Sequence, residues 1–137
     1  MTNITEGLTE AGMLQMWRAI PTARIRRGRT VKYFSMDSPD RNGKYGYGFL
    51  SMESGGTLFF RMSHLAGVEV STELPEPRLL YVRQYHFHTP IEEPKVGDFV
   101  RYSRRLRPCG CEESEAQPWM YERDYLAAEQ HLAELSN

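Results

Sequence analysis

One stretch of the chain alternates aromatic residues with glycine. Residues 45–49 read Tyr, Gly, Tyr, Gly, Phe. Because successive side chains of a β-strand point to opposite faces, this alternation predicts a strand with rings on one face and only glycine on the other. Glycine inside a strand marks close approach of another backbone or strong curvature. The sequence therefore predicts a curved or closely approached strand over residues 44–50.

A second apolar strand is expected directly after it. Residues 54–56 read Ser-Gly-Gly, and residues 57–62 read Thr-Leu-Phe-Phe-Arg-Met. A connection of this length predicts an antiparallel hairpin, with the rings of both strands on one face. The residues expected on that face are Tyr45, Tyr47, Phe49, Phe59 and Arg61, beside Lys32 or Tyr33 from a preceding strand over residues 30–34.

The opposite face of this hairpin has its own apolar residues. Leu50, Leu58 and Phe60, with Val31 from the preceding strand, can supply core contacts. The simpler interpretation, in which the rings form one wall of a barrel core, is therefore less favoured. A sheet face of flat rings and guanidinium groups suits single-stranded nucleic acid, because every base has a π-face and stacking contributes about 1–3 kcal/mol per base.

The ends of the chain predict helices. Residues 8–20 carry Met and Trp side chains at three- and four-residue spacing and are followed by Pro21, which predicts a short N-terminal helix. Asp124 is the expected N-cap of a closing helix. The apolar face of that helix is expected to consist of Tyr125, Ala128, Leu132 and Leu135.

Between the hairpin and the closing helix the pattern is less regular. Residues 66–95 are interrupted by four prolines but are rich in Leu, Val, Tyr and Phe over 78–88. Residues 78–88 predict an extended piece or an extra hairpin. Further strands are expected over 96–102 and 119–121, with a loop over 109–113 between them.

The formal net charge of −1 conceals an uneven distribution of charge along the chain. Residues 18–44 and 101–107 hold 12 of the 17 Lys and Arg residues but only 2 of the 18 acids. Arginine both binds phosphate through its forked donors and stacks on flat rings. We therefore expect basic side chains beside the ring face, although most charge runs are simply solvated surface.

Composition limits the class of protein. The chain of 137 residues is 40% hydrophobic and 12% aromatic, which is typical of one globular domain rather than a disordered chain. No stretch approaches the roughly 18–20 apolar residues that a membrane-spanning helix needs. The first residues lack the basic and apolar regions of a secretory signal, so a cytoplasmic location is expected.

At the aromatic strands the chain resembles the cold-shock domain family, whose members are five-stranded barrels of the OB type that bind single-stranded RNA and DNA. Residues 46–50 are similar to the family's first ribonucleoprotein motif and residues 58–63 to its second. Residues 31–34 are similar to its first-strand motif, and residues 94–100 to the segment entering its fourth strand. Tyr33, Arg61 and Met62 stand where the family usually has Trp, His and Phe.

The resemblance implies a mainly β fold, a five-stranded antiparallel barrel of the OB type with added N- and C-terminal helices. Residues 1–28 would form a helical extension, residues 29–122 the barrel with an insert over 66–93, and residues 123–137 the closing helix. The implied function is non-catalytic binding of single-stranded RNA or DNA, as an RNA chaperone or regulator. The implied binding residues are Lys32, Tyr33, Phe34, Lys44, Tyr45, Tyr47, Phe49, Phe59, Arg61, Met62 and Arg104.

The chain departs from the family at three places. The first turn contains an insertion over 36–43, the segment over 66–93 is longer than the usual connection, and both ends carry helices that a minimal cold-shock protein lacks. Such additions can cap the barrel, build a homodimer or cover the ring face. Capping is the expectation, because the apolar faces of helices need burial.

Other classes of function have weaker support. An RNA-recognition motif also has a Gly-aromatic run, but its second aromatic strand lies well upstream, with a helix between. No nucleophile elbow, phosphate-binding loop or zinc-protease helix is present. The neighbouring carboxylates Glu92 and Glu93 would point to opposite faces of a strand, as would Glu112 and Glu113. We therefore expect no catalytic activity.

Two further alternatives concern metal and protein partners. His86, His88, Cys109 and Cys111 could hold zinc, but Cys-x-Cys matches the usual ligand spacing poorly, so neither a metal nor another cofactor is expected. Residues 112–137 hold seven acids and one basic residue. The main alternative to nucleic-acid binding is therefore a protein-interaction module that uses this acidic part or the terminal helices.

Overall fold

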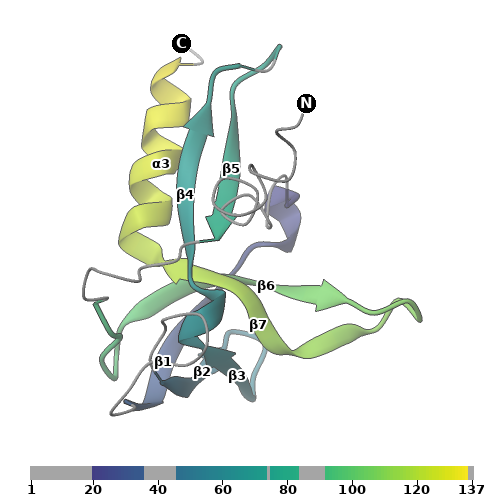
Figure 1. Ribbon diagram of the computed structural model, residues 1–137, viewed down its shortest axis with the longest axis vertical. Coiled ribbons are helices and arrows are strands. Elements are labelled where there is room, and N and C mark those ends of the chain that lie inside the picture. The colour runs from purple at the N-terminus through teal and green to yellow at the C-terminus, as the bar shows by residue number, and fades with distance from the viewer. Residues whose placement is uncertain (1–19, 36–45, 74, 84–91, 136–137) are drawn as a thin grey trace, which may run out of the picture.

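The computed structural model describes residues 20–35, 46–73, 75–83 and 92–135. These form a closed five-stranded barrel, a separate two-stranded hairpin and one C-terminal α-helix (Figure 1). The expectation of a mainly β fold with a barrel and a closing helix is confirmed. The expected N-terminal helix lies outside the described residues, except for its last position, Ile20.

The barrel consists of β1 (Arg26–Phe34), β2 (Tyr47–Met52), β3 (Thr57–Arg61), β6 (Phe99–Leu106) and β7 (Glu112–Tyr121). Its strands follow the closed order β1-β2-β3-β7-β6. All neighbours are antiparallel except β3 and β7, which are parallel. The expectation of a wholly antiparallel barrel is wrong at this ladder, because a closed ring with an odd number of strands cannot alternate direction throughout.

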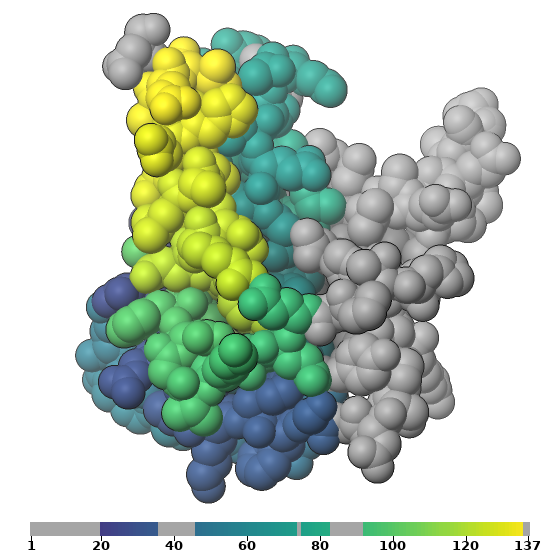
Figure 2. Space-filling view, turned by 90° about the vertical axis from the view of Figure 1, so that its left-hand side faces the viewer, coloured from purple at the N-terminus to yellow at the C-terminus, as the bar shows by residue number. Residues whose placement is uncertain are grey.

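The segment over 66–93 contains a hairpin, of which the second strand lies within residues 78–88, where an extended piece or an extra hairpin was expected, and the first strand was not predicted. Strands β4 (Ala66–Ser71) and β5 (Arg78–Arg83) pair antiparallel in a sheet of their own. Helix α3 (Glu122–Leu135) lies against this hairpin, and the two elements stand together above the barrel (Figure 2). Two single-turn 3₁₀ helices, η1 (Thr22–Arg24) and η2 (Met62–His64), precede β1 and follow β3.

Two hydrophobic cores meet at strand β7. Trp119 points into the barrel core, where its ring contacts Phe60 edge to face. The next residue, Met120, points the opposite way and joins Tyr81 of β5 and Tyr125 of α3 in a second core. Because alternate residues of one strand are buried on opposite faces, β7 ties the hairpin and α3 to the barrel.

Strand β1 contains an irregularity that decides which side chains face outward. The pairing of β1 with β2 shifts by one residue between Thr30 and Lys32. Thr30 is fully buried, whereas Val31 is 36% exposed. The expectation that Val31 supplies core contacts is therefore wrong. Beyond the bulge, the outward residues of β1 are Lys32 and Phe34.

The end of the chain differs from expectation in its boundaries. Strand β7 begins at Glu112, so the expected loop over 109–113 is shorter and the expected strand over 119–121 is much longer. Helix α3 begins at Glu122, directly after β7, which places Asp124 in the first turn and not at the N-cap. Tyr125 and Ala128 are buried as expected, but Leu135 is exposed.

Within the part of the chain that the structure describes, no helix is long and apolar enough to cross a bilayer.

Candidate nucleic-acid interface

Four aromatic side chains form a continuous row on the outer face of β1, β2 and β3. The ring centroids of Phe34 and Tyr47 are 5.2 Å apart, those of Tyr47 and Phe59 are 5.6 Å apart, and those of Phe59 and Phe49 are 5.5 Å apart. We call these four residues the aromatic platform. Phe34 is 44% exposed and Tyr47 38% exposed, while Phe49 and Phe59 are half-buried.

Strand register explains why the four rings meet. In the ladder between β1 and β2, Phe34 pairs with Tyr47, and in the ladder between β2 and β3, Phe49 pairs with Phe59. Paired residues of neighbouring strands share a face of the sheet. The bulge at Val31 sets the outward direction of Phe34 and therefore its contact with Tyr47.

The glycines between the rings allow β1 to approach β2 closely. A Cβ atom on Gly48 would lie 2.3 Å from the backbone oxygen of Lys32 and 3.0 Å from the ring of Phe60. Gly46 has a φ of 67°, and a Cβ there would lie 2.3 Å from the backbone oxygen of Phe34. Both glycines are required by backbone geometry, as the alternating pattern predicts.

Positive charge adjoins the platform through two side chains. The guanidinium carbon of Arg61 lies 5.0 Å from the ring centroid of Phe59, and the Arg61 side chain is largely exposed. Lys32 pairs with Phe49 across the ladder and is also exposed. A guanidinium over a ring is stabilised by the ring quadrupole and still presents donors to solvent.

One acid limits this positive charge. Glu115 of β7 pairs with Phe59 in the parallel ladder, and its Oε2 lies 3.2 Å from Nε of Arg61 and 3.1 Å from Nδ1 of His64. Neither Glu115 nor His64 was expected at this surface. The sequence carries no signal for the position of Glu115, because it depends on the parallel pairing of two strands more than 50 residues apart.

Two of the expected binding residues face the interior instead. Met62 is fully buried in the barrel core. The ring of Tyr33 stacks on Phe60 at 6.2 Å, and its hydroxyl donates a hydrogen bond to Glu93. Burial and this carboxylate raise the pKa of Tyr33 well above its ordinary value, so the hydroxyl stays protonated. Neither side chain belongs to the platform.

Arg104 also lies apart from the platform. It is on β6, which is separated from β3 by β7. Its Nε donates to the backbone oxygen of Glu113 at 2.6 Å, and its Nη1 lies 3.4 Å from a carboxylate oxygen of Glu112. The remaining two expected residues, Lys44 and Tyr45, lie outside the described residues.

Several arginines of the two basic clusters are paired with acids in space. Arg27 and Arg101 both donate to Glu122 of α3, at 2.7 and 2.8 Å. Arg26 pairs with Glu112 at 3.0 Å. Hydrogen bonds from these guanidinium groups hold the pKa values of Glu122 and Glu112 below their usual range. Within the described part of the chain, five of the nine basic residues of the two clusters are therefore paired with acids, which reduces the basic surface expected beside the rings.

Some cations near the barrel face remain outside this network. Among the described residues, Arg29, Lys32 and Arg105 take part in no ion pair. All three are exposed. Among the described cations, strand pairing places Lys32 beside Phe49 and ring contact places Arg61 over Phe59.

The two cysteines form a small exposed group at the tip of the hairpin between β6 and β7. Both Cys109 and Cys111 are free thiols, and the backbone N–H of Cys111 donates to Sγ of Cys109 at 3.4 Å. A side-chain hydrogen bond from Cys111 lowers the pKa of Cys109, and the same contact raises the pKa of Cys111. No group of three metal-ligating side chains occurs within the described residues. His86 and His88 lie outside them.

Comparison with known proteins gives no family for this chain. Neither the protein families, the curated proteins nor the solved structures that we searched contain a significant match.

Proposed function

We propose that this protein binds single-stranded RNA or DNA without catalysis, through the aromatic platform. The observation that carries the proposal is the row of four rings on an exposed sheet face, with centroids 5.2 to 5.6 Å apart and the Arg61 guanidinium over the ring of Phe59. Bases stack on such rings irrespective of sequence, because every base has a π-face. Arg61 and Lys32 would contact phosphate.

The same proposal assigns the barrel to the OB type. The supporting features are five strands, the order β1-β2-β3-β7-β6 and the parallel contact of β3 with β7. In OB folds, the face of the second and third strands binds oligonucleotides. In this chain, β2 and β3 carry three of the four rings of the platform.

The cold-shock resemblance agrees with this assignment. Its two ribonucleoprotein-like runs supply Tyr47, Phe49 and Phe59. Bases of any sequence can stack on this platform, and few of the described cations lie beside it. Such a surface suits weak, sequence-tolerant binding. A role as an RNA chaperone or regulator would use binding of this kind.

Binding of a fluorescent oligonucleotide tests the proposal. Fluorescence anisotropy of a labelled oligothymidine or oligouridine strand should rise with protein concentration. The logarithm of the association constant should fall linearly with the logarithm of salt concentration, with a slope of about −0.7 for each phosphate that is neutralised. Because strand pairing and ring contact place Lys32 and Arg61, among the described residues, beside the rings, we expect a shallow slope of about −1 to −2. Absence of binding at low salt would contradict the proposal.

A further inference from the structure

The hairpin between β6 and β7 carries two thiols at its tip. Cys109 and Cys111 are both free and exposed, with Gly110 between them. Figure 1 shows this tip extending past the side of the barrel, where none of the other described elements covers it. Both thiols are therefore open to a reagent from solvent.

Backbone hydrogen bonds hold the tip in a tight turn. The N–H of Arg107 donates to the carbonyl oxygen of Cys111 at 2.8 Å, and the N–H of Gly110 donates to the carbonyl oxygen of Arg107 at 2.8 Å. Gly110 has a φ of 88°, which residues with a Cβ atom rarely adopt. The turn places the backbone N–H of Cys111 3.4 Å from Sγ of Cys109. The two thiols thus lie within reach of each other.

The contacts between the thiols favour Cys109 as the nucleophile. A hydrogen bond to sulfur stabilises the thiolate more than the thiol. The side-chain hydrogen bond from Cys111 lowers the pKa of Cys109, and the same contact raises the pKa of Cys111. The thiolate is the form that attacks a disulfide. Cys109 therefore ionises first, while Cys111 keeps its proton for a later step.

Arginines hold the two acids that follow these thiols in the sequence. Glu112 pairs with Arg26 at 3.0 Å and with Arg104 at 3.4 Å, and Glu113 pairs with Arg107 at 3.5 Å. An unpaired carboxylate beside a thiol disfavours the thiolate by repulsion of like charges. The guanidinium groups offset this repulsion at the tip.

We propose that Cys109 and Cys111 form a dithiol site that exchanges with small disulfides, such as oxidised glutathione, and closes into a disulfide of its own. Sγ of Cys109 attacks one sulfur of the small disulfide, forms a mixed disulfide and releases one half as a thiolate. Cys111 then loses its proton, and its Sγ attacks Sγ of Cys109. This attack breaks the mixed disulfide, expels the second half as a thiolate and forms the bridge within the protein.

The two steps balance without a further reagent. Two electrons pass from the protein dithiol to the small disulfide, and the two thiol protons leave with its two halves. The small disulfide is thus the oxidant and is reduced to two thiols. The site uses neither the aromatic platform nor nucleic acid.

The bridge is expected to open again under reducing conditions. A disulfide that spans one intervening residue gains little from constraint of the unfolded chain, because that gain grows with the length of the closed loop. A disulfide at an exposed tip is also open to attack by another thiolate. Excess reduced glutathione should therefore reverse both steps.

The test treats the full chain, reduced and freed of reductant, with excess oxidised glutathione. We expect the intact mass to fall by that of two hydrogen atoms, and a peptide that links Cys109 to Cys111 to be found by mass spectrometry. Excess reduced glutathione should restore the starting mass. Cys111→Ser should instead stop at a stable glutathione adduct on Cys109, because the thiol that expels the second half is missing.

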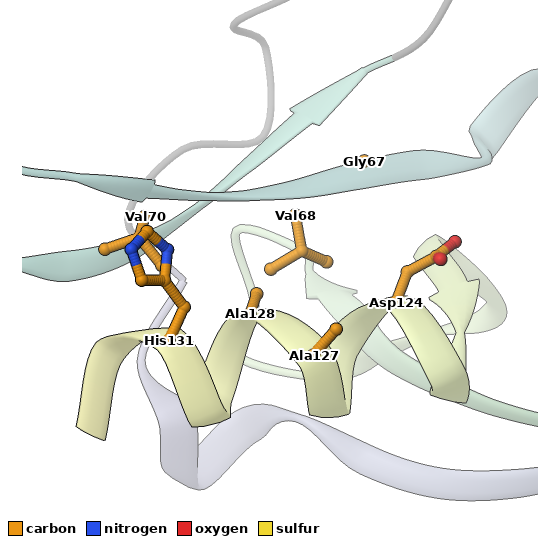
Figure 3. Close-up of a pocket in the computed structure, with 7 residues that line it drawn as sticks. All are labelled: Gly67, Val68, Val70, Asp124, Ala127, Ala128 and His131. Carbon is orange, nitrogen blue, oxygen red and sulfur yellow. The ribbon is translucent and has the colours of Figure 1, made fainter. Parts of the chain in front are cut away.

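A pair of thiols on α3 is the matched control. Figure 3 shows Ala127 and His131 on the face of this helix that lines the open groove beside β4, and both are exposed. Cβ atoms four residues apart on a helix are about 5–6 Å from each other. A disulfide needs about 3.5–4.5 Å. Ala127→Cys with His131→Cys, in a chain that also carries Cys109→Ser and Cys111→Ser, should therefore keep glutathione on each thiol without forming a bridge.

Three results would overturn the proposal. The first is a pair of stable glutathione adducts at the tip with no bridge, and the second is a bridge between two copies of the chain instead of within one. The third is a bridge on α3 that forms as readily as the bridge at the tip. None of these results depends on oligonucleotide binding, so failure here is distinct from failure of the platform.

Discussion

The rings of Tyr47 and Phe59 contact each other on the outer surface of the barrel, with centroids 5.6 Å apart and planes inclined by 38°. Rings of this size would gain free energy from burial. The interior is already occupied by Phe60, Trp119 and other fully buried side chains. Strands β2 and β3 therefore carry outward-facing rings that take no part in the barrel core. This arrangement is expected of a surface that stacks on a ligand.

Replacing Arg61 by Gln should weaken binding of a single strand and make the slope of its salt dependence shallower by about 0.7, because one phosphate contact is lost. Anisotropy titrations at a series of salt concentrations measure this slope. Arg104→Gln is the matched control, since Arg104 already donates to Glu112 and to the backbone of Glu113. Equal effects of the two substitutions would contradict the placement of Arg61 at the ligand.

Gly48→Ala should destabilise the protein by about 1–3 kcal/mol, the usual cost of overfilling a closely packed site. The added Cβ would lie 2.3 Å from the backbone oxygen of Lys32, so β1 and β2 must separate. Urea unfolding measures the change. Ser51→Ala in the same strand is the control and should stay within about 0.5 kcal/mol of the parent. An unchanged midpoint for Gly48→Ala would show that the two strands are not held this closely.

Met62→Ala should cost about 2–5 kcal/mol of stability, because it removes a fully buried side chain from the barrel core. Below the unfolding transition, the folded variant should bind a single strand as tightly as the parent. Thermal unfolding and anisotropy together make the measurement. Loss of affinity with unchanged stability would instead place Met62 at the ligand, as the cold-shock resemblance implies.

Alkylation of the two thiols should begin at Cys109. The thiolate is the reactive form, and the hydrogen bond from Cys111 lowers the pKa of Cys109 while the pKa of Cys111 is raised. As pH rises from below the ordinary thiol pKa, Cys109 should be alkylated first. The difference between the alkylation rates of the two thiols should vanish once both are ionised. Peptide mass spectrometry after brief treatment with iodoacetamide measures the ratio. Cys111→Ala should shift the profile of Cys109 to higher pH, and equal rates at neutral pH would contradict the contact.

Local pattern was sufficient to predict the parts of the fold in which neighbours in sequence are neighbours in space. The alternation over 45–49, the Ser-Gly-Gly turn and the apolar run over 57–62 predicted the hairpin of β2 and β3 and the outward direction of Tyr47, Phe49 and Phe59. Leu50, Leu58 and Phe60 were also placed correctly in the core. Each of these inferences needs only the two-residue repeat of a strand.

Features that depend on distant pairing could not be predicted in the same way. The bulge at Val31 directs Phe34 toward Tyr47. A bulge moves every later side chain of the strand to the other face, and no residue type in this stretch marks its position in the sequence. The ion pairs of Arg27 and Arg101 with Glu122 join residues up to 95 positions apart. For that reason, charge counted along the chain suggested a basic surface without showing that tertiary contacts pair several of its arginines with acids.

Single-ring substitutions test the central claim most directly. The measurement is the affinity of a labelled single-stranded oligonucleotide for the parent and for Tyr47→Ala, Phe59→Ala and Phe99→Ala. Phe99 is the control, because it is a 41% exposed aromatic with the Arg27 guanidinium 3.8 Å above its ring, but it lies on β6 outside the aromatic platform. We predict that Tyr47→Ala and Phe59→Ala each lose about 1–3 kcal/mol of binding free energy and that Phe99→Ala binds as the parent does. Unchanged affinity in both platform variants, or an equal loss in Phe99→Ala, would contradict binding through the platform.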